Sequence, residues 1–292
     1  MTFVVAGALM LDVIAAVSGD IRYGTDTPAE VSFHSGGAAA NLAHWMAFDG
    51  EHPHLYCVVG EDVAGTALVN ELEDAGVIVH ARRVHASTGA VIALVDGRGE
   101  RTMLPNATAN SGFETGMLAD ALHAGDHLHV SGYILLNEQS RPAALEYLAE
   151  ARRVGATTSI DPSSSGPIRT LGPERMLEMM RGTDLLLANE EEAETLTGET
   201  DPAAAAHALL AIAGTVIVKL GAEGALLATA AGTWFDPALP VDVIDTVGAG
   251  DAFGASAIVA WKAGNDPRTV LRTGNRNGAR CVAVRGARPP AL

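Results

Sequence analysis

The sequence predicts an α/β domain in which helices cover both faces of a mostly parallel sheet, with a small β appendage. Short, nearly continuous apolar runs alternate with helical segments for most of the 292 residues. Strands that are apolar along their whole length are typical of a parallel sheet that is buried on both faces. The expected strands are residues 2–8, 54–59, 127–131, 157–161, 184–188, 215–220 and 225–230. The expected helices are residues 38–48, 64–75, 141–153, 173–181, 190–196, 202–211, 249–263 and 268–284.

Two stretches break this alternation, at residues 13–34 and about 85–107. Both contain β-forming residues and turn signals, with weak helical periodicity. In the second stretch, residues 88–96 and 100–104 flank Gly97-Arg98-Gly99, which predicts a β-hairpin. We expect the two stretches to form a small β lid, inserted in one domain of residues 1–292, over a site at the carboxyl ends of the strands. The nearest thing to a flexible segment is the Ser-Ser-Ser-Gly-Pro stretch at 163–167.

Composition and charge narrow the class of protein. The formal net charge of -16 argues against nucleic acid or an anionic membrane as a general partner. Cys57 and Cys281 are the two cysteines, a number that suits a reducing compartment and free thiols. Residues 1–17 lack a basic leading region, and Asp12 interrupts them, so a first strand that ends at a functional acid fits better than a signal peptide. No run is long and apolar enough for a membrane span, and we expect a cytoplasmic protein.

The sequence Asp-Thr-Val-Gly-Ala-Gly-Asp-Ala-Phe-Gly at residues 245–254 opens a long Ala-rich helix. Small residues at Gly248, Ala249 and Gly250 let the backbone turn tightly and direct several N–H groups at one point. These groups lack partners within the helix, so an anion should bind there. Asp251 follows, and phosphoryl transfer needs this pairing of an anion site with a proton acceptor. The alternative is an ordinary Gly-rich turn before a solvated acid.

A second Gly-rich stretch and an isolated acid lie near the N-terminus. Gly36 and Gly37 allow a ligand to approach the backbone closely, and Asn41 offers a donor and an acceptor for hydroxyl groups. The alternative is a helix entry at which Asn41 contacts nearby backbone. Asp12 could bind a ligand or lie solvated in a loop.

Two further turns follow expected strands. Asn189 and Glu192 have capping-box spacing, and the same pair could also serve a magnesium ion. Gly221 and Gly224 follow Lys219 in a turn that suits either a nucleotide or a plain hairpin.

Taken together, these motifs resemble both signatures of the ribokinase-like (PfkB) family of carbohydrate kinases, in the correct order. The stretch from Asp245 to Phe253 is similar to the C-terminal signature, and Gly-Gly-Ala-Ala-Ala-Asn at 36–41 is similar to the N-terminal one. The resemblance covers nearly the whole chain. It implies a three-layer α/β/α ribokinase-like core with a β lid that often mediates homodimers. It also implies ATP-dependent phosphorylation of a hydroxymethyl group with Mg²⁺, and often activation by a monovalent cation such as K⁺.

The resemblance also assigns roles to individual residues. Asp251 would be the catalytic base, and the backbone amides of residues 248–251 the anion hole. The residues implied to bind the sugar are Asp12, Gly36, Gly37 and Asn41. The residues implied to lie at the adenine nucleotide are Lys219, Gly221, Gly224 and Asn275. The residues implied to serve metal ions are Asn189 and Glu192 for Mg²⁺, through water, and Asp245 for the monovalent cation.

The acceptor is less closely specified by these motifs. Ribokinases commonly show Gly-Gly-Lys-Gly-Ala-Asn, whereas this chain has Ala38 in place of the lysine, which counts against ribose itself. We expect an unphosphorylated, ribose- or fructose-like sugar, with ATP as the other ligand. A nucleoside is an alternative, since Tyr23 and Phe33 could stack on a base. A non-catalytic sugar-binding protein is a third, and the intact Asp251 argues against it.

Two other classes find no support. A dinucleotide-dependent oxidoreductase would need Gly-x-Gly-x-x-Gly after the first strand, which residues 6–9 do not supply. His127 and His129 alternate on one expected strand, but no cysteine or well-spaced acid completes a zinc site. We expect these strand-end histidines to be exposed or capped.

Overall fold

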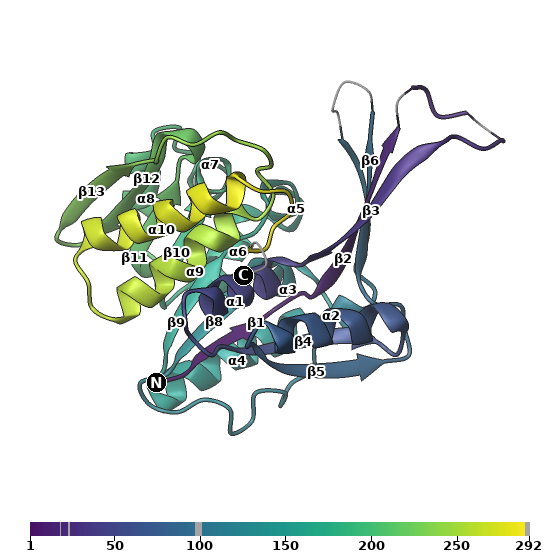
Figure 1. The fold of residues 1–292 in the computed structure, drawn as a ribbon. Coiled ribbons are helices and arrows are strands. Elements are labelled where there is room, and N and C mark those ends of the chain that lie inside the picture. The colour runs from purple at the N-terminus through teal and green to yellow at the C-terminus, as the bar shows by residue number, and fades with distance from the viewer. Residues whose placement is uncertain (18, 23, 97–100, 290–292) are drawn as a thin grey trace.

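The computed structural model, which describes residues 1–17, 19–22, 24–96 and 101–289, contains a nine-stranded sheet and a separate four-stranded sheet (Figure 1). The large sheet has the order β13-β12-β11-β10-β9-β8-β1-β4-β5, and it is parallel from β5 to β11. Its strands are β1 (Phe3–Ala6), β4 (His54–Gly60), β5 (Ile78–Val84), β8 (His127–Ser131), β9 (Thr157–Asp161), β10 (Thr183–Asn189), β11 (Ala213–Lys219), β12 (Gly224–Thr229) and β13 (Gly232–Pro237). The predicted, mostly parallel sheet is confirmed.

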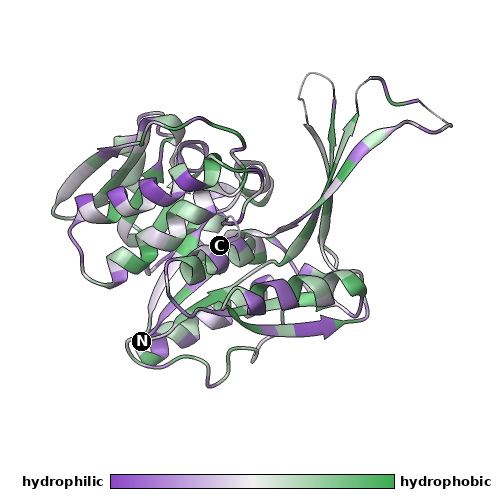
Figure 2. Ribbon diagram, in the orientation of Figure 1, coloured by the Kyte–Doolittle hydropathy of each residue, from purple (hydrophilic) through white to green (hydrophobic). Residues whose placement is uncertain are grey.

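Helices cover both faces of this sheet, because its central strands are apolar on both sides. On β10, Leu185 and Leu187 join one core cluster, whereas Leu186 and Ala188 join the other. In Figure 2 the helices of the body carry both purple and green residues, as is typical of helices with one polar and one apolar face. The helices that pack on the first cluster are α1 (Ala38–Phe48), α2 (Val63–Asp74), α9 (Ala249–Lys262) and α10 (Pro267–Val282). Those that pack on the second are α3 (Gly132–Leu136), α4 (Arg141–Val154), α5 (Ser165–Leu171), α6 (Pro173–Met180), α7 (Glu190–Thr197) and α8 (Pro202–Leu209).

The four-stranded sheet extends away from the body in Figure 1. Its order is β3 (Ala29–Gly36), β2 (Met10–Val17), β6 (Ala90–Val95), β7 (Arg101–Asn106). The outer pairs are antiparallel, as the expected hairpin of β6 and β7 requires, and the central pair β2–β6 is parallel. The turn expected at 97–99 lies outside the described residues. A short 3₁₀ helix, η1 (Ala109–Ser111), follows β7.

Several expectations from the sequence were wrong in detail. Asp12 does not end the first strand, which stops at Ala6; it lies inside β2, in the small sheet. Residues 163–167 do not form a flexible segment, since α5 begins at Ser165. His127 and His129 are not exposed; they are buried, and both contact the Ser159 hydroxyl. Burial lowers the pKa of both imidazoles, so they are neutral core side chains.

Candidate active site

A cavity of about 610 Å³ opens where the carboxyl ends of the parallel strands meet the root of the four-stranded sheet. Asp161, Asn189 and Lys219 reach it from the ends of β9, β10 and β11. Asp12 reaches it from β2 and Asp251 from α9. Residues from distant parts of the chain therefore meet at the edge of the sheet where α/β proteins bind ligands.

The two adjacent glycines before α1 allow two close approaches, that of the Asp12 carboxylate to Gly36 and that of the Ala8 backbone to Gly37. A Cβ atom on Gly36 would lie 2.3 Å from Asp12 Oδ2, and one on Gly37 would lie 2.4 Å from the Ala8 carbonyl oxygen. Gly37 also has φ of 96°, in the region that favours glycine. Burial raises the pKa of Asp12, and the charges of Arg288 and His34 offset this only in part. Gly36 thus lets a carboxylate lie against the backbone at the cavity wall.

Asn41 and Asp251 are in direct contact. Asn41 Nδ2 donates a hydrogen bond of 2.8 Å to Asp251 Oδ2, while Asn41 Oδ1 is buried and has no partner in the described part of the chain. Burial raises the pKa of Asp251 to about 7; the Asn41 hydrogen bond lowers it, and the nearby charge of Asp161 raises it. A carboxyl with a pKa near 7 can accept a proton at neutral pH, and its conjugate acid can release it again.

The start of α9 has the form expected of an anion site. Gly248 is the N-cap residue with φ of 78°, and a Cβ atom there would lie 2.5 Å from Ala287 Cα. The N–H groups of the first turn have no partner inside the helix. That of Ala249 donates to the Thr246 carbonyl at 3.3 Å, so the amides of Gly250 and Asp251 are better placed to receive a ligand.

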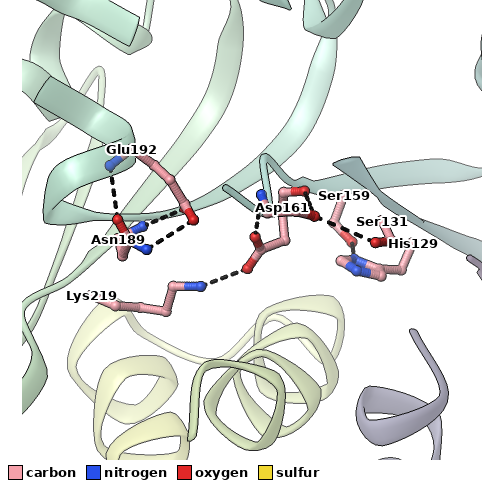
Figure 3. Close-up of polar contacts among 8 residues, drawn as sticks. His129, Ser131, Ser159, Asp161, Asn189, Glu192 and Lys219 are labelled. Carbon is pink, nitrogen blue, oxygen red and sulfur yellow. Dashed lines mark hydrogen bonds and ion pairs between the residues drawn. The ribbon is translucent and has the colours of Figure 1, made fainter. Parts of the chain in front are cut away.

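Lys219, Asp161 and Glu192 form the charged centre of the cavity (Figure 3), and Asp251 lines the same cavity. Lys219 Nζ donates to Asp161 Oδ2 at 2.5 Å. Burial lowers the pKa of Lys219, but the charges of Asp161, Glu192 and Asp251 raise it by more than this. The pKa is therefore raised overall, and the lysine is a cation. Asp161 was not among the residues predicted from the sequence. Its signal was present, because it is the last residue of an expected strand.

Asn189 and Glu192 form the capping box that their spacing predicts. Glu192 N–H donates to Asn189 Oδ1 at 2.8 Å, and Asn189 N–H donates to Glu192 Oε2 at 2.9 Å. Asn189 Nδ2 binds Glu192 Oε1, so both carboxylate oxygens are engaged. Glu192 is 3% exposed, and burial with the charge of Asp161 raises its pKa to about 7.

A second cavity adjoins the first and shares Lys219 and Gly250 with it. Its walls include Gly221 and Gly224, which were predicted to lie at a nucleotide, and apolar residues of the 238–247 loop. Asn275 also lines it, but its amide nitrogen is held by Asp236 and by the Pro237 carbonyl. The two cavities therefore meet at one ammonium group and one helix start.

Asp245 lies apart from the acidic cluster. Its Oδ1 accepts from Val247 N–H and its Oδ2 accepts from Gly286 N–H, both at 3.1 Å. Across the described part of the chain, no group of three His, Cys, Asp or Glu side chains is arranged to hold a metal ion directly.

Comparisons with known proteins agree with this architecture. The model of the pfkB family of carbohydrate kinases matches residues 2–292. The chain belongs to this family. It is therefore a carbohydrate kinase that uses ATP, and the resemblance stated from its motifs is confirmed.

Among relatives, the chain is similar to the ATP-dependent ribose-1-phosphate kinase of Halopiger xanaduensis, at 31% identity over 87% of this chain and 82% of the relative. It is 27% identical to the 2-dehydro-3-deoxygluconokinase of Thermoproteus tenax, over 98% of this chain and 90% of the relative.

Among solved structures, the pfkB kinase resembles ribokinase from Thermotoga maritima, with a TM-score of 0.83 and 25% identity over 98% of this chain and 94% of that one. A candidate ribokinase II from E. coli, solved in complex with ATP and Mg²⁺, has a TM-score of 0.85 at 22% identity, over 98% and 94% of the two chains. The described helices of the pfkB kinase include none that is long and apolar enough to cross a bilayer.

Proposed function

We propose that this kinase transfers the γ-phosphoryl group of ATP to a hydroxymethyl group of an unphosphorylated sugar, ribose- or fructose-like. The observation that carries the choice of a neutral acceptor is the charge of the larger cavity. Among its described lining residues, Lys219 is the one basic side chain; it is paired with Asp161 and also lines the second cavity. A phosphate on the acceptor would need basic groups of its own.

In this proposal the acceptor occupies the larger cavity and ATP the smaller one. Asp12 and Asn41 bind sugar hydroxyls, and Asp251 takes the proton of the attacking hydroxyl. The γ-phosphoryl group lies at the junction, between Lys219 Nζ and the Gly250 amide. A fixed cation and the start of a helix would stabilise the negative charge that develops there in the transition state. Phosphoryl-transfer sites lower the activation barrier in this way.

The carboxylates of this site fit Mg²⁺ held through water. Asp161 and Glu192 are hard oxygen ligands of the kind that Mg²⁺ prefers. Because Asn189 engages both oxygens of Glu192, the contact would run through the ion's water molecules. The ion would neutralise phosphate charge. Asp245 is the proposed neighbour of a monovalent cation.

Two other acceptors are weaker candidates. A ribose phosphate is the substrate named for one relative, but the described cavity wall offers it no free cation. For a nucleoside, Phe33 would have to stack on the base. In the register of the small sheet Phe33 pairs with Val13, whereas Asp12, one residue earlier, faces the cavity. Phe33 therefore points to the opposite face, where it is 68% exposed. Tyr23 lies outside the described residues.

The four-stranded sheet has two faces with different proposed roles. Asp12, Val91 and Pro105 pair across β2, β6 and β7 and line the cavity, so this face would be a lid over the sugar. The opposite face carries a row of apolar side chains in register, Phe33, Val13, Ile92 and Leu104, three of them exposed. We propose that this row pairs two copies of the chain as a homodimer.

The use of ATP and the two free, buried thiols support a cytoplasmic location.

The lid and the dimer can be tested together. Phe33→Glu should halve the mass measured by light scattering, because a charge replaces the most exposed side chain of the row. Amide exchange in β2, β3, β6 and β7 of the wild type should slow when a saturating acceptor sugar is added. A wild type of monomeric mass would contradict the dimer. Unchanged exchange with sugar demonstrably bound would contradict the lid.

The proposed function itself is tested by an assay of ADP release over a matched panel. The panel contains D-ribose and D-fructose, their 1-, 5- or 6-phosphates, and adenosine. The neutral sugars should show the highest kcat/KM. A phosphosugar or nucleoside that exceeds both neutral sugars tenfold would overturn the choice of acceptor and leave the kinase assignment intact.

Asp12→Ala separates sugar binding from nucleotide binding. The loss of a charged partner for a buried hydroxyl costs about 1.5–3 kcal/mol, so sugar affinity should fall roughly tenfold or more. ATP affinity should stay nearly constant, because Asp12 lines only the larger of the two cavities. Calorimetric titration with each ligand measures both values. Equal loss of both affinities would point to a structural role for Asp12.

A further inference from the structure

Asn110 is a buried side chain of the larger cavity that has no hydrogen-bond partner among the described residues. It is 7% exposed, and no described group pairs with its Oδ1 or Nδ2. It lines the cavity from η1, directly after the last strand of the small sheet. Buried amides are almost always hydrogen-bonded, because an unpaired one keeps the full cost of its desolvation.

The position of this amide is fixed by its packing. A Cβ atom on Gly89 would lie 2.6 Å from Asn110 Nδ2 and 3.3 Å from Met10 Cγ, so the absent side chain makes room for the amide. Gly89 in turn holds the start of β2, since its carbonyl accepts from Leu11 N–H at 2.9 Å. Asn110 thus lies at the root of the lid, beside apolar Met10, with a rigid neighbour behind it.

A neighbouring asparagine of the same cavity shows what a structural role would look like. Asn137 Oδ1 accepts from the N–H groups of Gln139 and Ser140, at the start of α4. Its Nδ2 donates to the Ser111 hydroxyl at 3.1 Å. Both polar atoms of Asn137 are used inside the protein, whereas both polar atoms of Asn110 are left for a ligand.

We propose that Asn110 determines acceptor specificity by binding a sugar hydroxyl other than the one that Asp251 deprotonates. The amide supplies one acceptor and two donor hydrogens, which suits a hydroxyl that both donates and accepts. The attacking hydroxyl is bound elsewhere, beside Asn41 and Asp251. This inference rests on the proposed function, in which the larger cavity holds the acceptor.

The test compares the wild type with Asn110→Ala on the best acceptor of the panel and on its singly deoxygenated analogues. In the wild type, several analogues should lose at least tenfold in kcat/KM, because a buried polar group is left unpaired. In Asn110→Ala, one of these penalties should disappear while the others remain. KM for the parent sugar should rise tenfold or more, and KM for ATP should not change. Asn110→Leu, whose side chain has the same branched shape without polar atoms, should give the same pattern.

Stability distinguishes this role from a structural one. Asn110→Ala removes two unpaired buried atoms, so its Tm should equal or exceed that of the wild type. The matched control Asn137→Ala should lower Tm. It should still show every loss in kcat/KM that the deoxygenated analogues cause in the wild type. If Asn110→Ala lowers Tm as the control does, or retains all the penalties, the inference is wrong. The panel includes phosphosugars and a nucleoside, so whichever compound proves to be the acceptor serves as the probe. An error in the proposed acceptor class can therefore be distinguished from an error in the role of Asn110.

Discussion

Asp251→Asn should reduce kcat by about 10²- to 10⁴-fold, the range that a general base contributes. The amide keeps the shape of the carboxylate and the contact with Asn41, but it cannot accept the proton of the attacking hydroxyl. Sugar affinity should change little, since the base acts mainly as the proton moves. ATP should bind slightly more tightly, because one negative charge near its phosphates is gone. Near-normal turnover in a folded variant would contradict the assignment.

The same variant should be more stable than the wild type at pH 8. Burial raises the pKa of Asp251 to about 7, from an ordinary value of 3.8. A carboxyl with a raised pKa in the folded state lowers stability as the pH rises from about 4, where the unfolded chain ionises, to about 7, and the cost is constant above that. The neutral amide of the variant carries no such cost. The gain in Tm should therefore shrink towards pH 4, and a gain that is the same at pH 4 and pH 8 would have another origin.

Lys219→Met should have the second large effect, on both stability and turnover. The substitution leaves Asp161 without its cation, close to Glu192 and Asp251. Removal of one partner from a buried ion pair costs about 3–5 kcal/mol. Without a donor at the junction of the two cavities, kcat should also fall about 10²- to 10³-fold. Chemical denaturation and steady-state kinetics measure the two losses.

The double variant with Asp161→Asn separates these losses. It removes the unpaired carboxylate together with the lysine, so most of the lost stability should return. Turnover should stay low, because the ammonium group that faces the phosphoryl group is still missing. Recovered turnover in the double variant would mean that Lys219 serves only to neutralise Asp161.

Much of this architecture followed from local patterns. The helix at 38–48 and the strands at 127–131 and 157–161 have the predicted bounds, because apolar runs and Gly-rich starts mark them clearly. The capping box of Asn189 and Glu192 is a local interaction, and its spacing alone predicts it. The motif residues Asp12, Asn41 and Asp251 line one cavity, although they come from β2 of the small sheet, from α1 and from α9.

Other features depend on tertiary contacts that no local pattern encodes. β5 and β13 were not predicted; β13 alternates between exposed and half-buried positions at the sheet edge. The burial of His127 depends on Thr157 and Ser159 of the neighbouring strand. Asn110 lies in a single 3₁₀ turn, and its importance appears only when its amide is found without a partner.

The pH dependence of kcat/KM, compared between the wild type and Asp251→Asn, tests the central claim most directly. With both substrates well below saturation, this quantity reports the free enzyme. The wild type should lose activity as the pH falls through about 7, where Asp251 takes up its proton. Titration of ATP or of Glu192 would persist in the variant, so only the inflection that belongs to Asp251 should vanish, leaving a low and flatter profile. If the variant keeps the full inflection, or retains the activity of the wild type, Asp251 is not the base.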